Sequence, residues 1–294
     1  MITAGAGPGP LPDEPRPFHY RARFASRAFV PGAHASRVGG SGLDLAGVVP
    51  LARARDPRRL DMASSLRDPF GGWWAREHRQ RSVVPVLLLA DASASMSAHG
   101  PALDGAVRDF ARSLQRSTAQ GGDPFGLLSF DETVHISALL RPTRSRAAAA
   151  AGVLAWTTAS RDGSAGAAGV LHAAALLPRQ RSLVFLLSDF CWPLPLLDAA
   201  LGQLAQHDVV PVWLQADQPP ERLPARGLVE LRDAESGAQR LLWLRPALRA
   251  RWQAALAAHR QAVTACFARH QCTPLHLDAP FDADAVSRHF VARR

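Results

Sequence analysis

A carboxylate and two hydroxyls follow a long apolar run in the first third of the chain. Residues 83–90 read VVPVLLLA, and Asp91, Ser93 and Ser95 come directly after them. An apolar run of this length, rich in Val and Leu, is typical of a central parallel strand that is covered on both faces. Because ligands of open parallel sheets bind beyond the carboxyl ends of the strands, the sequence predicts a cluster of hard oxygen ligands at that edge.

The spacing Asp-x-Ser-x-Ser in this segment resembles the metal-ion-dependent adhesion site of von Willebrand factor A-type domains. The resemblance implies that Ser93 and Ser95 ligate Mg²⁺, with Mn²⁺ or Ca²⁺ as alternatives, and that Asp91 acts through water. It also implies two later ligands, a threonine ahead of a helix and an aspartate after the fourth strand. The same three residues fit an ordinary turn that caps a helix, because Asp and Ser accept hydrogen bonds from free helix N–H groups.

Both later ligands have candidates in the chain. Residues 181–190, RSLVFLLSDF, repeat the buried-strand pattern and contain Asp189, which takes the aspartate position. Ser164, in the loop RDGSAG ahead of an Ala-rich helical pattern, stands at the threonine position, and Thr157 and Thr158 remain competitors. Mg²⁺ prefers octahedral oxygen coordination with few protein carboxylates. Two aspartates with two or three hydroxyls suit that preference and leave the ion able to accept a carboxylate from a partner.

The composition limits the function. With 294 residues, 47% of them hydrophobic, the chain can bury a large core. All 34 basic residues are Arg, spread along the whole length, so the net charge of +9 does not by itself favour nucleic acid as the partner. Because Lys is absent, a Walker A phosphate loop and a Schiff-base lysine are excluded. Three cysteines without a Cys-x-x-Cys pair argue against a disulfide framework or structural zinc, and Cys191 is assigned no role.

The sequence also predicts a cellular location. No apolar run reaches the roughly 18 residues of a membrane span. The first residues, MITAGAGPGPLPDEPRP, lack the basic start and apolar core of a signal peptide. We therefore expect a soluble globular protein of the cytoplasm.

A second resemblance lies upstream of the first core strand. The segment Asp56-Pro57-Arg58-Arg59-Leu60-Asp61 resembles the Asp-Pro-Arg-Arg-Ile-Asp-Trp signature of a large bacterial family of unknown function, whose genes often neighbour MoxR-type AAA+ ATPases. Met62 stands where that family usually has Trp, and residues 41–47 and 74–77 resemble the same region. The resemblance implies a MoxR-type ATPase, or the client that it remodels, as the partner. The segment also fits a Pro turn whose paired charges hold the flank against the core.

The patterns predict an α/β fold with a doubly wound, mostly parallel sheet, of the von Willebrand factor A and Rossmann-like kind. Residues 1–17 are expected to be disordered, 18–82 to form an N-terminal flank, 83–217 the core, 218–244 a β-hairpin insertion, and 245–294 a helix, strand and helix that complete the core. Within the flank, 18–24 is predicted as a short strand and 38–44 as a loop. We further expect the flank and the hairpin to pack together as a small β subdomain. Core strands are predicted at 83–90, 123–130, 133–139, 183–188, 209–215 and 274–277, hairpin strands at 228–232 and 239–244, and helices at 101–120, 145–159, 165–177, 196–207, 246–271 and 282–292.

These expectations favour a binding protein over an enzyme. A hydrolase triad would use a serine of the first loop with His99 and Asp189, but the Gly-x-Ser-x-Gly elbow is absent and the order Ser, His, Asp differs from that of α/β-hydrolases. We expect a non-enzymatic adaptor that grips an acidic side chain of a partner through its metal ion. The alternatives are a basic scaffold that binds nucleic acid or an acidic protein without metal, and an A-type fold with a degenerate, empty site.

Overall fold

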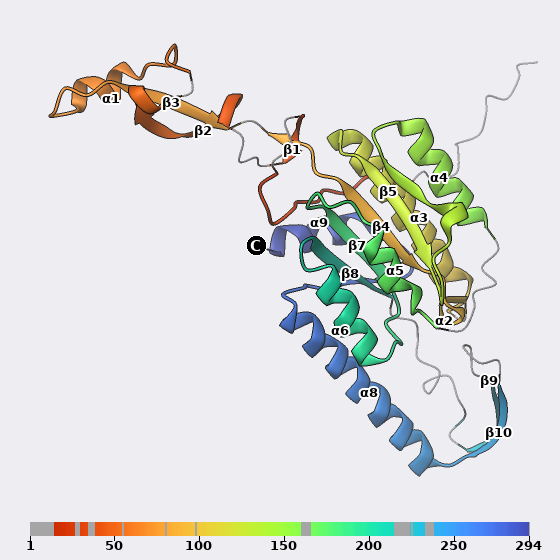
Figure 1. The fold of residues 1–294 in the computed structure, drawn as a ribbon. Helices are drawn as coiled ribbons and strands as arrows, with labels where there is room; N and C mark the ends of the chain where they lie inside the picture. Colours follow the sequence, from red (N-terminus) through yellow and green to blue (C-terminus); the bar gives the residue numbers. More distant parts are fainter. Residues whose placement is uncertain are drawn as a thin grey trace, which may run out of the picture.

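The computed structural model describes residues 15–26, 30–34, 39–54, 56–79, 81–97, 99–159, 166–214, 224, 226–232 and 238–293. Its core is a sheet of six strands in the order β11-β8-β7-β4-β5-β6, parallel throughout except for the β5–β6 pair. The strands are β4 (Val86–Asp91), β5 (Phe125–Phe130), β6 (Leu140–Thr143), β7 (Leu183–Ser188), β8 (Asp208–Leu214) and β11 (Leu275–Leu277). After β4 the chain adds β5 and β6 on one side and then crosses to β7 and β8 on the other (Figure 1). The carboxyl ends of β4 and β7 therefore meet where the strand order reverses, which is where α/β sheets bind ligands.

Helices cover both faces of this sheet. One apolar cluster joins the sheet to α3, α4 and α9, and a second joins its other face to α5, α6 and α8. Val86, Leu88 and Ala90 point into the first cluster, and Leu87 and Leu89 into the second. Because successive residues of a strand face opposite sides, burial of both faces requires the continuous apolar run of β4. The helices are α3 (Pro101–Gly121), α4 (Arg146–Thr158), α5 (Gly169–Ala175), α6 (Leu194–Gln203), α8 (Pro246–Arg269) and α9 (Ala283–Ala292). The predicted fold class is confirmed.

Residues 15–26 form an extended segment on the first apolar cluster, and the strand predicted at 18–24 is not formed. The Phe18 ring stacks on Phe110 at 5.8 Å between centroids, and the Phe18 N–H donates to Ser117 Oγ at 2.8 Å. The Arg23 N–H donates to the Asp208 carboxylate at 2.7 Å. These backbone donors are bonded to core side chains, so the segment joins no strand ladder. Of the stretch expected to be disordered, residues 1–14 lie outside the described residues.

Residues 39–79 form an arm that projects from the core (Figure 1). In this arm, β2 (Gly39–Pro50) pairs antiparallel with β3 (Trp74–Arg79), and η1 (Leu51–Arg53) and α1 (Met62–Arg67) lie between them in the chain. The loop predicted at 38–44 is wrong from Gly39 onward, because the Gly-rich stretch joins β2 through irregularities in its register with β3. The short strand β1 (Pro31–His34) precedes the arm, and His34 Nε2 lies 2.7 Å from Asp123 Oδ2 in the core.

The β-hairpin is formed as predicted, but it stands apart from the arm. Strands β9 (Gly227–Arg232) and β10 (Gln239–Leu244) pair antiparallel as a separate two-stranded sheet. The hairpin lies beside the start of α8, on the opposite side of the core from the arm (Figure 1). The expected packing of flank and hairpin into one β subdomain is therefore wrong.

Two further predictions need correction. The strand predicted at 133–139 is replaced by the short helix η2 (Ile136–Ala138), and the antiparallel edge strand is β6, because Val134 bridges back to Phe130 in a tight turn. The helix predicted from residue 165 begins at Gly169, whose N–H donates to the Asp131 carbonyl at 2.9 Å. A Cβ at Gly169 would lie 2.6 Å from the Thr133 backbone, so only glycine allows this approach. Among the described residues, no helix is long and apolar enough to cross a membrane.

Candidate metal centre

Asp91 is the last residue of β4, and its carboxylate lies buried at the carboxyl edge of the sheet. Its Oδ2 accepts hydrogen bonds from Ser188 Oγ at 2.6 Å and from Trp192 Nε1 at 2.8 Å. Its Oδ1 accepts the Ser93 N–H at 2.8 Å, the local turn contact that Asp favours. Three neutral donors therefore fix the orientation of this carboxylate.

Ser93 and Ser95 place their hydroxyls side by side, with 3.2 Å between the two oxygens. Ser93 is buried just after β4, and Ser95 is half-buried in the one-turn helix α2 (Ala94–Ser97). Ser95 also hydrogen-bonds the Asp189 carboxylate. The two hydroxyls thus link the turn after β4 to the end of β7.

Asp189 follows β7 and is brought beside the first loop by the β4–β7 pairing, in which Ala90 lies opposite Leu187. Its Oδ2 lies 3.0 Å from His99 Nε2, and its Oδ1 accepts the Cys191 N–H at 3.0 Å. His99 therefore lies at the edge of the group. Four of the five predicted ligands are gathered at this edge of the sheet.

The fifth predicted ligand, Ser164, lies in 160–165, outside the described residues. Its competitors, Thr157 and Thr158, end α4, and their hydroxyls donate to the Leu154 carbonyl at 3.0 and 2.8 Å. Both hydroxyl protons are used within the helix. The choice between Ser164 and Thr158 stays a prediction.

The two carboxylates have opposite pKa shifts. The pKa of Asp91 is raised to about 6, first by burial and then by the charge of Asp189, although hydrogen bonds from Ser188 and Ser93 oppose the rise. Burial would also raise the pKa of Asp189, but hydrogen bonds from His99, the Cys191 N–H and Ser95, together with the His99 charge, outweigh burial and lower it. Like charges in one buried site repel each other, so a bound cation would stabilise the doubly ionised pair.

The donor set fits a hard divalent cation. Carboxylate and hydroxyl oxygens are ligands that Mg²⁺ accepts, and the ion usually keeps several waters besides one or two carboxylates. Ser93, Ser95, Asp91 and Asp189 are the described residues that would hold it. The raised pKa of Asp91 marks the excess of negative charge that such an ion would balance.

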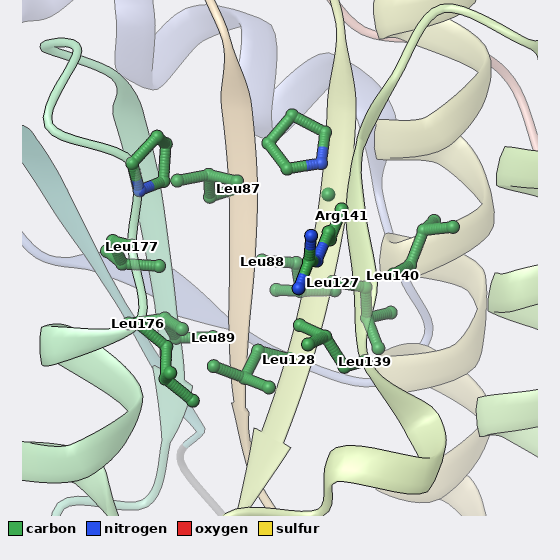
Figure 2. Close-up of a pocket in the computed structure, with 13 residues that line it drawn as sticks. Leu87, Leu88, Leu89, Leu127, Leu128, Leu139, Leu140, Arg141, Leu176 and Leu177 are labelled. Atoms are coloured by element: carbon green, nitrogen blue, oxygen red, sulfur yellow. The ribbon is translucent and has the colours of Figure 1, made fainter.

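A separate apolar cavity of about 280 Å³ lies over the earlier residues of β4 and β5 (Figure 2). Leucines from both strands line it, together with Leu176 and Leu177 after α5. Arg141 is the charged member of the lining, and its guanidinium lies at the cavity in Figure 2. This cavity is distinct from the polar group at the carboxyl edge, since it contains none of the predicted ligands.

Comparison with known proteins identifies the family. Residues 56–262, more than half of the chain, match the family described as "Protein of unknown function DUF58". The chain belongs to this family. The match begins at Asp56, the first residue of the Asp-Pro-Arg-Arg segment. A relative from Paracoccus denitrificans, named "Uncharacterized protein in moxR 3'region", is 34% identical over 101 residues, which are 34% of this chain and 96% of the relative.

Solved structures with a similar fold include two of distant sequence. BatB from Bacteroides thetaiotaomicron is 13% identical with a TM-score of 0.41, and the similarity covers 71% of this chain and 98% of BatB. Proximal thread matrix protein 1 from the mussel byssus, solved with a zinc-occupied MIDAS motif, is 15% identical with a TM-score of 0.35, over 46% of this chain and 39% of that protein. These are similarities of fold.

Sequence reasoning overlooked Asp131 at this edge. Asp131 is buried after β5, its Oδ1 accepts the Thr133 N–H at 2.9 Å, and its Oδ2 lies 2.9 Å from His135 Nε2. The Ala92 N–H donates to the Phe130 carbonyl at 2.7 Å, which places Asp131 next to the first loop. A signal was present, because three adjacent strands of this DUF58 sheet end in the same way, LLSFD, LLLAD and FLLSD.

Two groups that orient Asp91 were also missed. Ser188 was noted only as the neighbour of Asp189, and Trp192 was not considered, yet both donate to Asp91 Oδ2. Both lie about a hundred positions from Asp91 in the chain. Their role depends on strand pairing, so no local pattern could have revealed it.

Proposed function

We propose that this chain is a non-enzymatic adaptor that binds a divalent cation, Mg²⁺ by preference, and through it an acidic side chain of a partner protein. The observation that carries the proposal is that two buried carboxylates, Asp91 and Asp189, end adjacent strands with two serine hydroxyls in contact between them. The ligands of the proposed site are Asp91, Ser93, Ser95, Ser164 and Asp189. When bound, the ion supplies an electrophilic position for a carboxylate oxygen.

The chain's own residues would keep this position open and oriented. Ser188 and Trp192 hold the Asp91 carboxylate, and the Cys191 N–H holds that of Asp189, so neither has to be ordered when the ion binds. The serine hydroxyls are neutral and do not cancel the charge of the ion. A partner carboxylate can therefore complete the shell at little cost in side-chain ordering.

The proposed partner is a MoxR-type AAA+ ATPase or the client that it remodels, in chaperone-like assembly or maturation of a protein complex. The name of the Paracoccus relative, which places its gene beside moxR, supports this choice. ATP hydrolysis would come from the partner, since a chain without Lys has no Walker A loop.

Capture of a purified MoxR-type ATPase from the same cell on the immobilised full chain tests the proposal. We expect retention with Mg²⁺, loss with EDTA, and loss at any Mg²⁺ concentration for Asp91→Ala. Asp109→Ala, which changes a half-exposed Asp on α3 outside the site, is the matched control and should behave like the unmodified chain. Circular dichroism checks that each variant is folded.

Capture that is the same with and without EDTA would contradict the proposal. If that chelator-insensitive capture also falls steeply with salt, the net charge of +9 would instead favour the basic scaffold. The two outcomes separate the functions in one experiment.

A further inference from the structure

A second group of metal-ligating side chains lies where α6 packs on α8. It consists of Asp198 on α6, Cys266 on α8 and His270 directly after α8. One ligand atom of each lies within 4.8 Å of the other two. Asp198 Oδ1 is 3.0 Å from His270 Nε2 and 3.7 Å from Cys266 Sγ. None of the three belongs to the proposed Mg²⁺ site.

The helical spacing brings the thiol and the imidazole together. Cys266 and His270 are four residues apart, so they lie on the same face of α8. Cys266 is 1% exposed, and Val263, Cys266 and Phe267 are the buried residues of α8. The Asp198 and His270 side chains are 51% and 23% exposed, so the group has a buried sulfur floor and a rim that is open to an entering ion.

The three donors suit a borderline-soft ion. Zn²⁺ binds thiolate sulfur at about 2.3 Å and imidazole nitrogen or carboxylate oxygen at about 2.0–2.2 Å, in tetrahedral geometry. Those bond lengths place neighbouring ligand atoms roughly 3.2–3.6 Å apart, and the observed 3.0 and 3.7 Å lie close to that interval. Acidic clusters alone are common on protein surfaces, but thiolate and imidazole select transition metals over Mg²⁺.

We infer that Asp198, Cys266 and His270 form a site for a divalent transition-metal ion of the zinc type, which ties α6 to α8. On binding, the Cys266 thiol loses its proton to solvent and its sulfur forms the metal–sulfur bond, while His270 Nε2 gives its lone pair. The thiolate and the Asp198 carboxylate balance the two charges of the ion. The fourth tetrahedral position is left for water or for a ligand from a partner.

Arg269 is the competing cation. Its guanidinium lies 2.9 Å from the same Asp198 Oδ1, and its side chain is 64% exposed. An exposed ion pair of this kind is weak, so the guanidinium can give way to a metal ion. Removal of Arg269 should therefore tighten metal binding, whereas removal of a ligand should weaken it.

The site would fix a long helix at its attachment to the core. The buried residues of α8 begin at Val263, and the helix starts beside the β9–β10 hairpin, well beyond the sheet (Figure 1). A metal bond between Asp198 and the last turns of α8 would hold the helix that leads from the hairpin to the core. This role is independent of the proposed Mg²⁺ site.

Titration of the reduced full chain with Co²⁺ tests the inference. A thiolate ligand produces a near-ultraviolet sulfur-to-cobalt charge-transfer band, which an all-oxygen site cannot produce. We expect this band to saturate at one ion per chain and to be displaced by Zn²⁺. Asp91→Ala should keep the band, so a failure of the Mg²⁺ site and a failure of this site are distinguishable.

The variants give the inference its sharpest form. We expect Cys266→Ser to lose the band, His270→Ala and Asp198→Asn to bind Co²⁺ at least about tenfold more weakly, and Arg269→Gln to bind up to about fivefold more tightly. Cys272→Ser, which removes the nearby thiol that hydrogen-bonds the His270 carbonyl, is the matched control and should keep the band. Absence of the band in the unmodified chain, or its persistence in folded Cys266→Ser, would overturn the inference. If Cys266→Ser does not fold, unchanged affinity in both His270→Ala and Asp198→Asn would overturn it equally.

Discussion

Ser188 determines how the Asp91 carboxylate is presented to a metal ion. Its hydroxyl donates to Asp91 Oδ2 at 2.6 Å and accepts the Phe190 N–H at 2.9 Å, so it connects the two strand ends that carry the aspartates. Hydrogen-bond partners of metal ligands commonly contribute about 10–100-fold to metal affinity. We therefore expect Ser188→Ala to weaken Mn²⁺ or Mg²⁺ binding by about that factor, measured by isothermal titration calorimetry.

Ser117→Ala is the matched control for this prediction. Ser117 is another buried serine whose hydroxyl donates to one carbonyl and accepts one N–H, those of Ser113 and Phe18. Each variant loses comparable hydrogen bonds, so both should lose comparable stability, about 1–3 kcal/mol. Equal metal affinity in the two variants would argue that Ser188 has no part in the site.

His289 gives the fold a sensitivity to acid. Burial lowers the pKa of His289 to about 4, and the charges of Arg293, Arg23 and His276 act in the same direction. Its Nε2 has no hydrogen-bond partner within the described structure. The folded chain therefore refuses a proton that the unfolded chain accepts below about pH 6.5.

The free energy of unfolding should accordingly fall as pH is lowered from about 6.5 to about 4, since the folded pKa lies below the unfolded one. We expect a smaller fall for His289→Leu, measured by urea unfolding at several pH values. His19→Leu, at an exposed histidine, should keep the full pH dependence. Identical profiles for His289→Leu and the unmodified chain would refute this role.

At the scale of elements, the Asp-Pro-Arg-Arg segment builds the turn that holds the arm together. Asp61 caps α1 by accepting the Ala63 and Ser64 N–H groups, and its other oxygen lies 3.0 Å from Arg76 Nε on β3. The Arg76 N–H donates to the Arg59 carbonyl at 2.8 Å. The conserved-looking pattern is thus explained by structure, and Met62, in the usual Trp position, is half exposed.

We expect Asp61→Ala to loosen the arm without affecting the sheet. Amide hydrogen exchange over α1 should become roughly fivefold faster, the effect typical of a lost N-cap. Asp61→Asn keeps an acceptor for the cap and should change exchange much less. Faster exchange in β4 as well would show that the arm and the core unfold together, contrary to this account.

Strands buried on both faces were the elements that the sequence specified best. The boundaries of β7 match the predicted 183–188, because a continuous apolar run has one arrangement in a sheet covered by helices. The Gly-rich start of β2 and the segment at 18–24 were predicted wrongly, since their structure depends on pairing with β3 and on the side chains of α3 and β8. The same distinction holds at the site, where Asp91 and Asp189 were predicted from strand ends while Asp131, Ser188 and Trp192 were not.

For the whole molecule, the sheet positions one polar site while two extensions leave the core in opposite directions (Figure 1). The arm exposes Leu66 and Phe70, which are 81% and 94% accessible, and the hairpin exposes Leu241 and Trp243. Large exposed apolar residues on projecting elements are typical of protein contact surfaces. This arrangement suits an adaptor, in which the metal site would hold one acidic group while other surfaces make further contacts.

The central claim is that the carboxyl edge of the sheet binds a divalent cation, and direct cation binding tests it. Mn²⁺ bound to the full chain is measured by loss of the free-ion electron paramagnetic resonance signal, with Mg²⁺ as competitor. We predict one ion per chain that Mg²⁺ displaces, with binding lost in Asp91→Ala and retained in the α3 control Asp109→Ala. Binding that is unchanged in folded Asp91→Ala, or absent from the unmodified chain, would contradict the account.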